Sequence, residues 1–265
     1  MPGPSHRRKP IALTIAGSDS GGGAGLQADL RAFEASGVHG VCALTCVTAQ
    51  NPVTVDQVVA LAPRFVQAQL TSLFQELRPG AAKTGMLVNE GVVRGVASWW
   101  KRHGAGVPLV IDPVMISTSG VRLLSVGGVE ALVSRLFPLA TLITPNLPEA
   151  EVLLGHPIRS LAGLVQGAQE ASERWGCAVL LKGGHLRGAR EAVDIFCREG
   201  KVTLLKARFI QGIRTHGTGC TYSARIAGEL ASGQELLEAV RAAKRHVTAA
   251  IQGSRRIGEH WVLGT

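Results

Sequence analysis

The feature that most constrains the fold is an alternation of short apolar runs with longer segments of helical periodicity. Runs such as 11–16, 107–112 and 178–182 have the length and composition of buried strands. The segments between them carry apolar residues three or four positions apart, as in the stripe 236–251. Alternation of this kind is typical of a mainly parallel sheet flanked by helices, so the sequence predicts an α/β fold.

The expected elements follow from these periods and from local start and stop signals. Strands are expected at 11–16, 38–47, 81–84, 107–112, 139–144 and 178–182, with a hairpin of 193–197 and 202–205. Helices are expected after the glycine turn 21–23, from Pro63, through 92–99, after a Ser160 cap, and at 219–231 and 235–251. Neither a repeat nor a linker interrupts the pattern. We therefore expect one domain over residues 11–265, preceded by a flexible basic N-terminus of residues 1–10.

Composition and charge exclude several classes of protein. The chain is 46% hydrophobic and 18% charged, which supports a sizeable globular core. Its net charge of +9 raises the possibility of a polyanionic partner. The basic residues are dispersed, however, apart from 6–9 and 255–256, and they are not interleaved with aromatic residues as in single-strand binders. A basic surface that attracts phosphorylated substrates is favoured over nucleic-acid binding.

The cysteines and the apolar runs indicate a soluble protein of a reducing compartment. Five cysteines are an odd number, and their spacing matches no zinc pattern. The first ten residues lack the apolar region of a secretory signal, and no run approaches the ~18 apolar residues of a membrane span. We therefore expect a cytoplasmic protein that does not bind the membrane.

The sharpest chemical motif is the segment His216-Gly217-Thr218-Gly219-Cys220, which directly precedes an expected helix. Two glycines around a threonine allow successive backbone N–H groups to converge on an anion, and the helix dipole adds to the attraction. A plain glycine-rich cap is the alternative interpretation, and the pattern alone supports both equally.

A second glycine cluster, residues 17–25, follows the first strand and opens a helix that contains Asp29. It fits neither a dinucleotide fingerprint nor a Walker loop, because the spacing and the Gly-Lys-Ser/Thr ending are missing. We interpret it as a turn where a ligand approaches the backbone. By itself, Asp29 is more typical of a solvated or capping acid than of a ligand contact.

Polar residues also follow several expected strands, at the sheet edge where open α/β folds bind ligands. Asp112, Lys182 and Lys83 are three of them. Asn146 and Glu149 lie three residues apart at a helix start, where they offer oxygens to a hard cation or to its waters. A simple capping box is the favoured alternative for this pair.

The motifs AGSDSGGGAGLQADL, VTAQN, KTGML, DPVM, TPNLPEA, LKGGH and HGTGC occur in this order. Jointly they resemble the hydroxymethylpyrimidine and phosphomethylpyrimidine kinases of thiamine biosynthesis, within the ribokinase-like superfamily, over residues 11–251. The resemblance implies a three-layer fold with a central, mostly parallel sheet, helices on both faces and no large lid domain. It also implies ATP and Mg²⁺ as cofactors, a homodimer, and phosphorylation of hydroxymethylpyrimidine and its monophosphate.

The same resemblance implies a set of site residues. The pyrimidine would be held by Asp29 and Gln50, in a pocket lined by Gly17, Val47 and Met86. The anion hole would comprise Gly217, Thr218 and Gly219, with Lys182 neutralising the ATP phosphates. The magnesium ion and its waters would be organised by Asp112, Asn146 and Glu149, with Thr218 and Asn146 also contacting the nucleotide.

Cys220 stands where many ribokinase relatives have a catalytic aspartate, so the resemblance makes it a candidate base. A helix N-terminus lowers the pKa of a thiol, which favours that hypothesis. The alternative is that Cys220 packs against the substrate without taking a proton. Loose transition states of phosphoryl transfer tolerate a weak base, because positioning and electrostatics dominate catalysis.

Two other functions stay open on the sequence. A pyridoxal kinase of the same branch shares the Cys220 loop and acts on a similar hydroxymethyl heteroaromatic, although Gln50 favours the pyrimidine. A non-catalytic pyrimidine or nucleotide sensor is the alternative from another class, because fold does not guarantee function.

Overall fold

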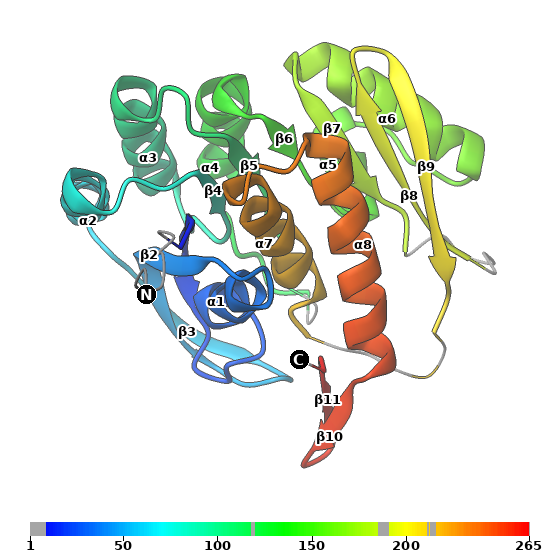
Figure 1. Ribbon diagram of the computed structural model, residues 1–265, viewed down its shortest axis with the longest axis horizontal. Helices are drawn as coiled ribbons and strands as arrows, with labels where there is room; N and C mark the ends of the chain where they lie inside the picture. The colour runs from blue at the N-terminus through cyan, green and yellow to red at the C-terminus, as the bar shows by residue number, and fades with distance from the viewer. Residues whose placement is uncertain (1–8, 118–119, 185–190, 211, 213–215, 265) are drawn as a thin grey trace, which may run out of the picture.

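A nine-stranded sheet forms the centre of the molecule in the computed structural model, which describes residues 9–117, 120–184, 191–210, 212 and 216–264 (Figure 1). Its strands are β1 Ile11–Ser18, β2 His39–Gln50, β3 Val55–Ala60, β4 Ala81–Thr84, β5 Leu109–Ile111, β6 Leu142–Ile143, β7 Ala178–Lys182, β8 Glu191–Arg198 and β9 Lys201–Arg208. They lie in the order β3-β2-β1-β4-β5-β6-β7-β8-β9. Residues 1–8, most of the predicted flexible N-terminus, lie outside the described residues.

The six central strands are parallel, and antiparallel strands stand at the two edges. β2, β1, β4, β5, β6 and β7 pair in parallel, whereas β3 and the β8–β9 hairpin pair antiparallel. The chain runs outward from β1 to β2 and then crosses back to β4 on the other side of β1. Such a reversal opens a crevice at the carboxyl ends of the strands, which is where doubly wound sheets bind ligands.

Helices cover both faces of the sheet and complete three layers (Figure 1). They are α1 Gly25–Ala35, α2 Pro63–Glu76, α3 Glu90–His103, α4 Val126–Ala131, α5 Leu147–Leu154, α6 Leu161–Trp175, α7 Thr218–Ala231 and α8 Leu236–Gln252. One core cluster packs α2 to α6 on one face, and a second packs α1, α7 and α8 on the other. Alternation along β5 illustrates this: Leu109 and Ile111 belong to the first cluster and Val110 to the second. The predicted fold class is confirmed.

Most expected elements are present, and prolines explain the shortened ones. The strands at 81–84 and 178–182 have the predicted bounds, and the Ser160 side chain accepts a hydrogen bond from Gly163 N at 3.1 Å as the predicted cap. The run 107–112 contributes only Leu109–Ile111, because Pro108 and Pro113 flank it and proline cannot donate to a sheet. Part of 139–144 is instead a 3₁₀ turn, Phe137–Leu139, around a proline.

Three elements were not expected from the sequence. They are β3, the helical segment from α4 through a π turn at Leu132–Leu136, and a small hairpin of β10 Arg255–Ile257 with β11 His260–Val262. β3 is an exposed edge strand of mixed polarity, so it lacks the apolar run that reveals a buried strand. In the described part of the chain, no helix combines the length and apolarity needed to cross a membrane.

Candidate active site

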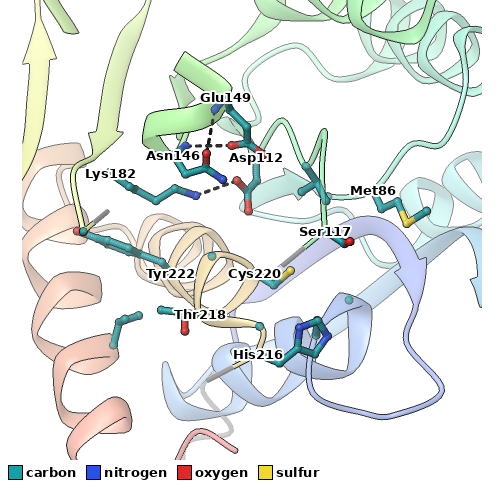
Figure 2. A pocket seen from close by; sticks show the side chains of 18 of the residues that line it. Met86, Asp112, Ser117, Asn146, Glu149, Lys182, His216, Thr218, Cys220 and Tyr222 are labelled. Atoms are coloured by element: carbon teal, nitrogen blue, oxygen red, sulfur yellow. Dashed lines mark hydrogen bonds and ion pairs between the residues drawn. The ribbon is translucent and has the colours of Figure 1, made fainter. Parts of the chain in front are cut away.

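A cavity of about 730 Å³ lies at the carboxyl ends of the parallel strands, and Figure 2 shows side chains that line it. The ends of β1, β2, β4 and β7 and the start of α7 all contribute to its wall. In Figure 2, Lys182, Asp112, Asn146 and Glu149 gather at one end, and Met86, Cys220 and His216 lie toward the other. The cavity therefore joins the cluster around Lys182 to a second group of side chains around Cys220 and His216.

The start of α7 has the backbone conformation that the predicted anion hole requires. Gly217 is the N-cap of α7 in the left-handed conformation, with φ of 81°, and no side chain caps the helix there. A Cβ at Gly217 would collide with the carbonyl oxygen of Gly23, so this position requires glycine. Gly217, Thr218 and Gly219 line the cavity, and the positive end of the helix dipole faces it.

Lys182 supplies a cation beside this helix start. Its Nζ lies 3.1 Å from Asp112 Oδ1, and a Cβ on Gly219 would be 3.4 Å from the same Nζ. Burial alone would lower the pKa of Lys182, but the carboxylates of Asp112 and Glu149 raise it above the ordinary value. The side chain therefore stays charged and can neutralise a phosphate near the α7 amides.

Asn146 and Glu149 form the capping box that was the favoured interpretation. Asn146 Oδ1 accepts from Glu149 N, and Glu149 Oε2 accepts from Asn146 N, both at 2.9 Å. Glu149 Oε1 accepts from Met115 N at 3.1 Å. Burial raises the pKa of Glu149, and the Asp112 charge adds to this rise, while Lys182 opposes it.

These oxygens fit a magnesium ion that is held mainly through water and phosphate. Those of Asp112 already accept from Lys182, Thr144 and Ser223, and those of Glu149 from backbone amides. Mg²⁺ keeps several waters and takes one or two carboxylates plus substrate phosphates, so lone pairs left on Asp112, Asn146 and Glu149 suit its hydration shell. No group of three His, Cys, Asp or Glu side chains suited to a metal occurs among the described residues.

At the other end, three of the five predicted pyrimidine contacts line the cavity: Gly17, Gln50 and Met86. Gly17 is packed against Cys46, which leaves no room for a side chain. Val47 is 42% exposed and lies outside the lining, where its neighbour Thr48 stands instead. The reason is a bulge: pairing passes from Ala16–Leu44 to Ser18–Val47, so β2 gains one residue and its alternation shifts.

Asp29 also lies outside the cavity lining, because it is committed to a buried ion pair. Both of its oxygens lie 3.1 Å from Lys83 Nζ, and Thr14 Oγ1 donates to Oδ2 at 2.6 Å. Burial raises the pKa of Asp29, against the pull of Lys83. Lys83, rather than Asp29, lines the cavity, and the sequence marked Lys83 only as one of several polar residues at strand ends.

Cys220 lines the cavity at the first turn of α7, as predicted. Its environment acts opposite to the expected helix effect: burial, assisted by the Asp29 and Asp112 charges, raises the pKa of the thiol to about 11, while Lys83 opposes the rise. At neutral pH, Cys220 is therefore a protonated thiol.

Two further residues line the cavity without a predicted role, Asp19 and His216. Nε2 of His216 lies 3.2 Å from Asp19 Oδ2 and 3.0 Å from the side-chain amide of Gln50. All three residues line the cavity. His216 opens the HGTGC motif and Asp19 lies in the glycine cluster, but 197 positions separate them, so no local pattern reveals their contact.

The fold and this cavity are those of a ribokinase-like small-molecule kinase: an uncapped helix start, a buried lysine and acidic side chains line the same cavity. The family described as phosphomethylpyrimidine kinase matches residues 19–263, and the chain belongs to that family. It is 46% identical over 250 residues to a hydroxymethylpyrimidine/phosphomethylpyrimidine kinase of Synechococcus elongatus, covering 94% of each chain.

Solved structures show the same architecture. The phosphomethylpyrimidine kinase of Clostridium difficile 630 matches with a TM-score of 0.80 and 39% identity over 92% of this chain and all of that one. An ADP complex of Bacillus subtilis pyridoxal kinase matches with a TM-score of 0.88 and 36% identity, over 96% of this chain and 97% of that one. The chain is therefore similar in fold both to a phosphomethylpyrimidine kinase and to a pyridoxal kinase.

Proposed function

We propose that this enzyme uses ATP to phosphorylate 4-amino-5-hydroxymethyl-2-methylpyrimidine and then its monophosphate, in the biosynthesis of thiamine diphosphate. The observation that carries the proposal is the cavity itself, which joins Lys182 and the Gly217–Gly219 amides to Gln50 and Met86. One end suits the phosphates and the other a small polar ring. Membership of the phosphomethylpyrimidine kinase family supports the same assignment.

In the proposed mechanism the protein positions the reactants and offsets charge. The substrate hydroxyl is aimed at the γ-phosphate over the start of α7. Lys182 and the amides of Gly217, Thr218 and Gly219 stabilise the charge that develops on the transferring phosphoryl group. Thr218 and Asn146 contact the nucleotide. When bound through Asp112, Asn146 and Glu149, Mg²⁺ would screen the phosphate charges.

Cys220 stays a candidate base in this proposal, and its raised pKa favours the alternative, contact with the substrate as a thiol. Asp29 contributes by holding Lys83 in the cavity wall. Cys220→Ser with near wild-type turnover and intact binding would refute the base assignment.

The test is ATP consumption by the purified protein with hydroxymethylpyrimidine, its monophosphate and pyridoxal in parallel, with products identified by mass. Turnover of both pyrimidines, and slower turnover of pyridoxal, is the expected result. No turnover of any of the three would refute the proposal and favour the sensor. Salt-sensitive DNA binding without ATP turnover would point the same way.

Pyridoxal kinase is the second candidate, favoured by the likeness to the Bacillus subtilis pyridoxal kinase. A pocket can distinguish the pyrimidine from pyridoxal by only a few hydrogen bonds, so side activity on pyridoxal is expected. A clear preference for pyridoxal in the parallel assay would assign the enzyme to vitamin B6 metabolism instead.

We further propose a cytoplasmic homodimer. All five cysteines are free thiols, which suits a reducing compartment. An apolar pair supports the dimer: Val47 and Val59 are cross-strand neighbours, 42% and 58% exposed, on the edge formed by β2 and β3. In the described part of the sheet, β3 pairs only with β2, so its outer edge is open.

A further inference from the structure

His216 occupies a position that none of the roles above uses. It lies beside Gln50, the residue proposed to read the pyrimidine, and beside Asp19 of the glycine-rich turn. The contact is closely built, because a Cβ on Gly23 would approach His216 Cδ2 to 2.9 Å. The imidazole therefore bridges the turn after β1 and the end of β2, inside the cavity wall.

Asp19 can only accept a hydrogen bond from His216. Its Oδ1 accepts from Gly21 N at 2.8 Å, and its Oδ2 accepts from Gly23 N and Ala24 N at 3.1 and 2.8 Å. Burial would raise the pKa of Asp19, but hydrogen bonds from His216 and from the backbone amides hold it below the usual value. An ionised carboxylate surrounded by donors is an acceptor only.

The proton on His216 is therefore placed on Nε2, 3.2 Å from Asp19 Oδ2. The opposite tautomer would direct the Nε2 lone pair at a carboxylate, which is repulsive. The structure has the Nε2 atom of Gln50 at 3.0 Å from His216 Nε2, and this order would set two N–H donors against each other. The Gln50 amide must therefore be turned by 180°, so that its oxygen accepts from the imidazole. The two ends of an amide have nearly the same shape, and the hydrogen-bond network decides their order. Gln50 therefore presents Oε1 to His216.

This order determines what Gln50 offers to a substrate. Its NH₂ group donates to a ring nitrogen, and the second lone pair of Oε1 accepts from an adjacent amino group. We propose that His216, held by Asp19, is a positioning residue that orients the Gln50 amide so that the site selects an aminopyrimidine edge. This inference rests on the proposed function, and specifically on Gln50 as the pyrimidine contact.

The matched probe is the 4-oxo analogue of the substrate. In its lactam form this ring presents a carbonyl acceptor beside an N–H donor, the reverse of the aminopyrimidine order. The wild-type enzyme is expected to prefer the amino compound in kcat/KM. In His216→Ala the Gln50 amide is free to turn, and this preference is expected to narrow about tenfold, the usual effect of one lost orienting hydrogen bond.

Two further variants separate positioning from simple structural damage. His216→Gln places an amide nitrogen where Nε2 stood and should restore the preference, whereas His216→Asn, whose amide is one methylene shorter, should behave like His216→Ala. The KM for ATP and the thermal unfolding midpoint should change little in all three. An unchanged preference in His216→Ala would overturn the inference.

A measurement without substrate keeps the inference falsifiable if a variant fails to fold. Nitrogen-15 NMR of the ligand-free wild-type protein should show the Nε2–H form of His216. The Nδ1–H tautomer would overturn the inference. A wild-type enzyme that leaves the aminopyrimidine unphosphorylated would refute the proposed function instead, and the tautomer would still decide what His216 does to Gln50.

Discussion

At the scale of single residues, the cavity holds ionisable groups whose states depend on burial. Cys220 lies close enough to Lys83 and Asp29 for their charges to shift its pKa, and Cys220 in turn raises the pKa of Lys83. Removing one of them changes the electrostatic surroundings of the others. Stability measurements therefore test these groups without requiring activity.

The first prediction concerns the stability of the folded protein at alkaline pH. The pKa of Cys220 is about 11 in the folded state, against 9.0 for an ordinary thiol. The folded state favours the protonated thiol, because the pKa of Cys220 is higher there than in the unfolded chain. The stabilisation that results is complete below pH 9 and is lost as the pH rises toward 11. Between pH 8 and pH 11 the free energy of unfolding should therefore fall by about 2 kcal/mol more in the wild type than in Cys220→Ala. Urea unfolding of both proteins across this range measures it, and parallel pH profiles would contradict it.

The second prediction concerns Lys83. Lys83 and Asp29 are both fully buried, with Nζ 3.1 Å from the carboxylate. Lys83→Met leaves a buried charge without its partner, so the free energy of unfolding should fall by about 3–5 kcal/mol. Lys83→Met with Asp29→Leu removes both charges and should recover much of this loss.

The matched control for Lys83 is an exposed ion pair of the same length. Lys9 Nζ lies 3.0 Å from Glu34 Oε2, with the two side chains 45% and 75% exposed. Lys9→Met should therefore cost less than about 1 kcal/mol. Equal losses in Lys9→Met and Lys83→Met would show that burial of the pair does not matter.

At the scale of elements, the start of α7 is where backbone conformation and function coincide. Gly217 has φ of 81°, and a Cβ at this position would collide with the Gly23 carbonyl oxygen. Gly217→Ala should both strain the backbone and displace the anion-binding amides, with kcat falling about 10²-fold, the scale of losing one preorganised donor. Gly233 is the matched control: its φ is 88°, but a Cβ there meets nothing within 4 Å. Gly233→Ala should cost stability alone, so equal losses of kcat in both variants would contradict the role of the loop.

Elements were predictable where a local pattern produced them. β7 is an apolar run that ends in Lys182, and Ser160 and Asn146 are caps defined by residues three positions away. β3 was not predictable, because an exposed edge strand needs no apolar run. The exclusion of Val47 from the cavity depends on the bulge in β2, which is set by pairing with β1 and leaves no local signal.

Site residues, like the elements, were predictable where the local sequence determines their position. Residues at strand ends and in glycine-rich loops, such as Asp112, Lys182 and Gly217, were predictable because their position in the fold places them at one sheet edge. Contacts between distant segments were not. The pairing of Asp29 with Lys83 and that of His216 with Asp19 join residues 54 and 197 positions apart, and only the folded chain brings them together.

At the scale of the whole molecule, the edge formed by β2 and β3 is where a second copy is proposed to bind. Val59→Lys puts a charge into the centre of the apolar pair with Val47, so the variant should be monomeric where the wild type is dimeric. Val152→Lys is the matched control, because Val152 is 56% exposed on α5, which lies on another part of the fold. Light scattering on the three proteins measures their mass. A lysine buried in the interface without a partner costs more free energy than such an edge contact contributes, so a dimer through this edge cannot tolerate it. If Val59→Lys stays dimeric, or if only Val152→Lys loses the dimer, the interface lies elsewhere.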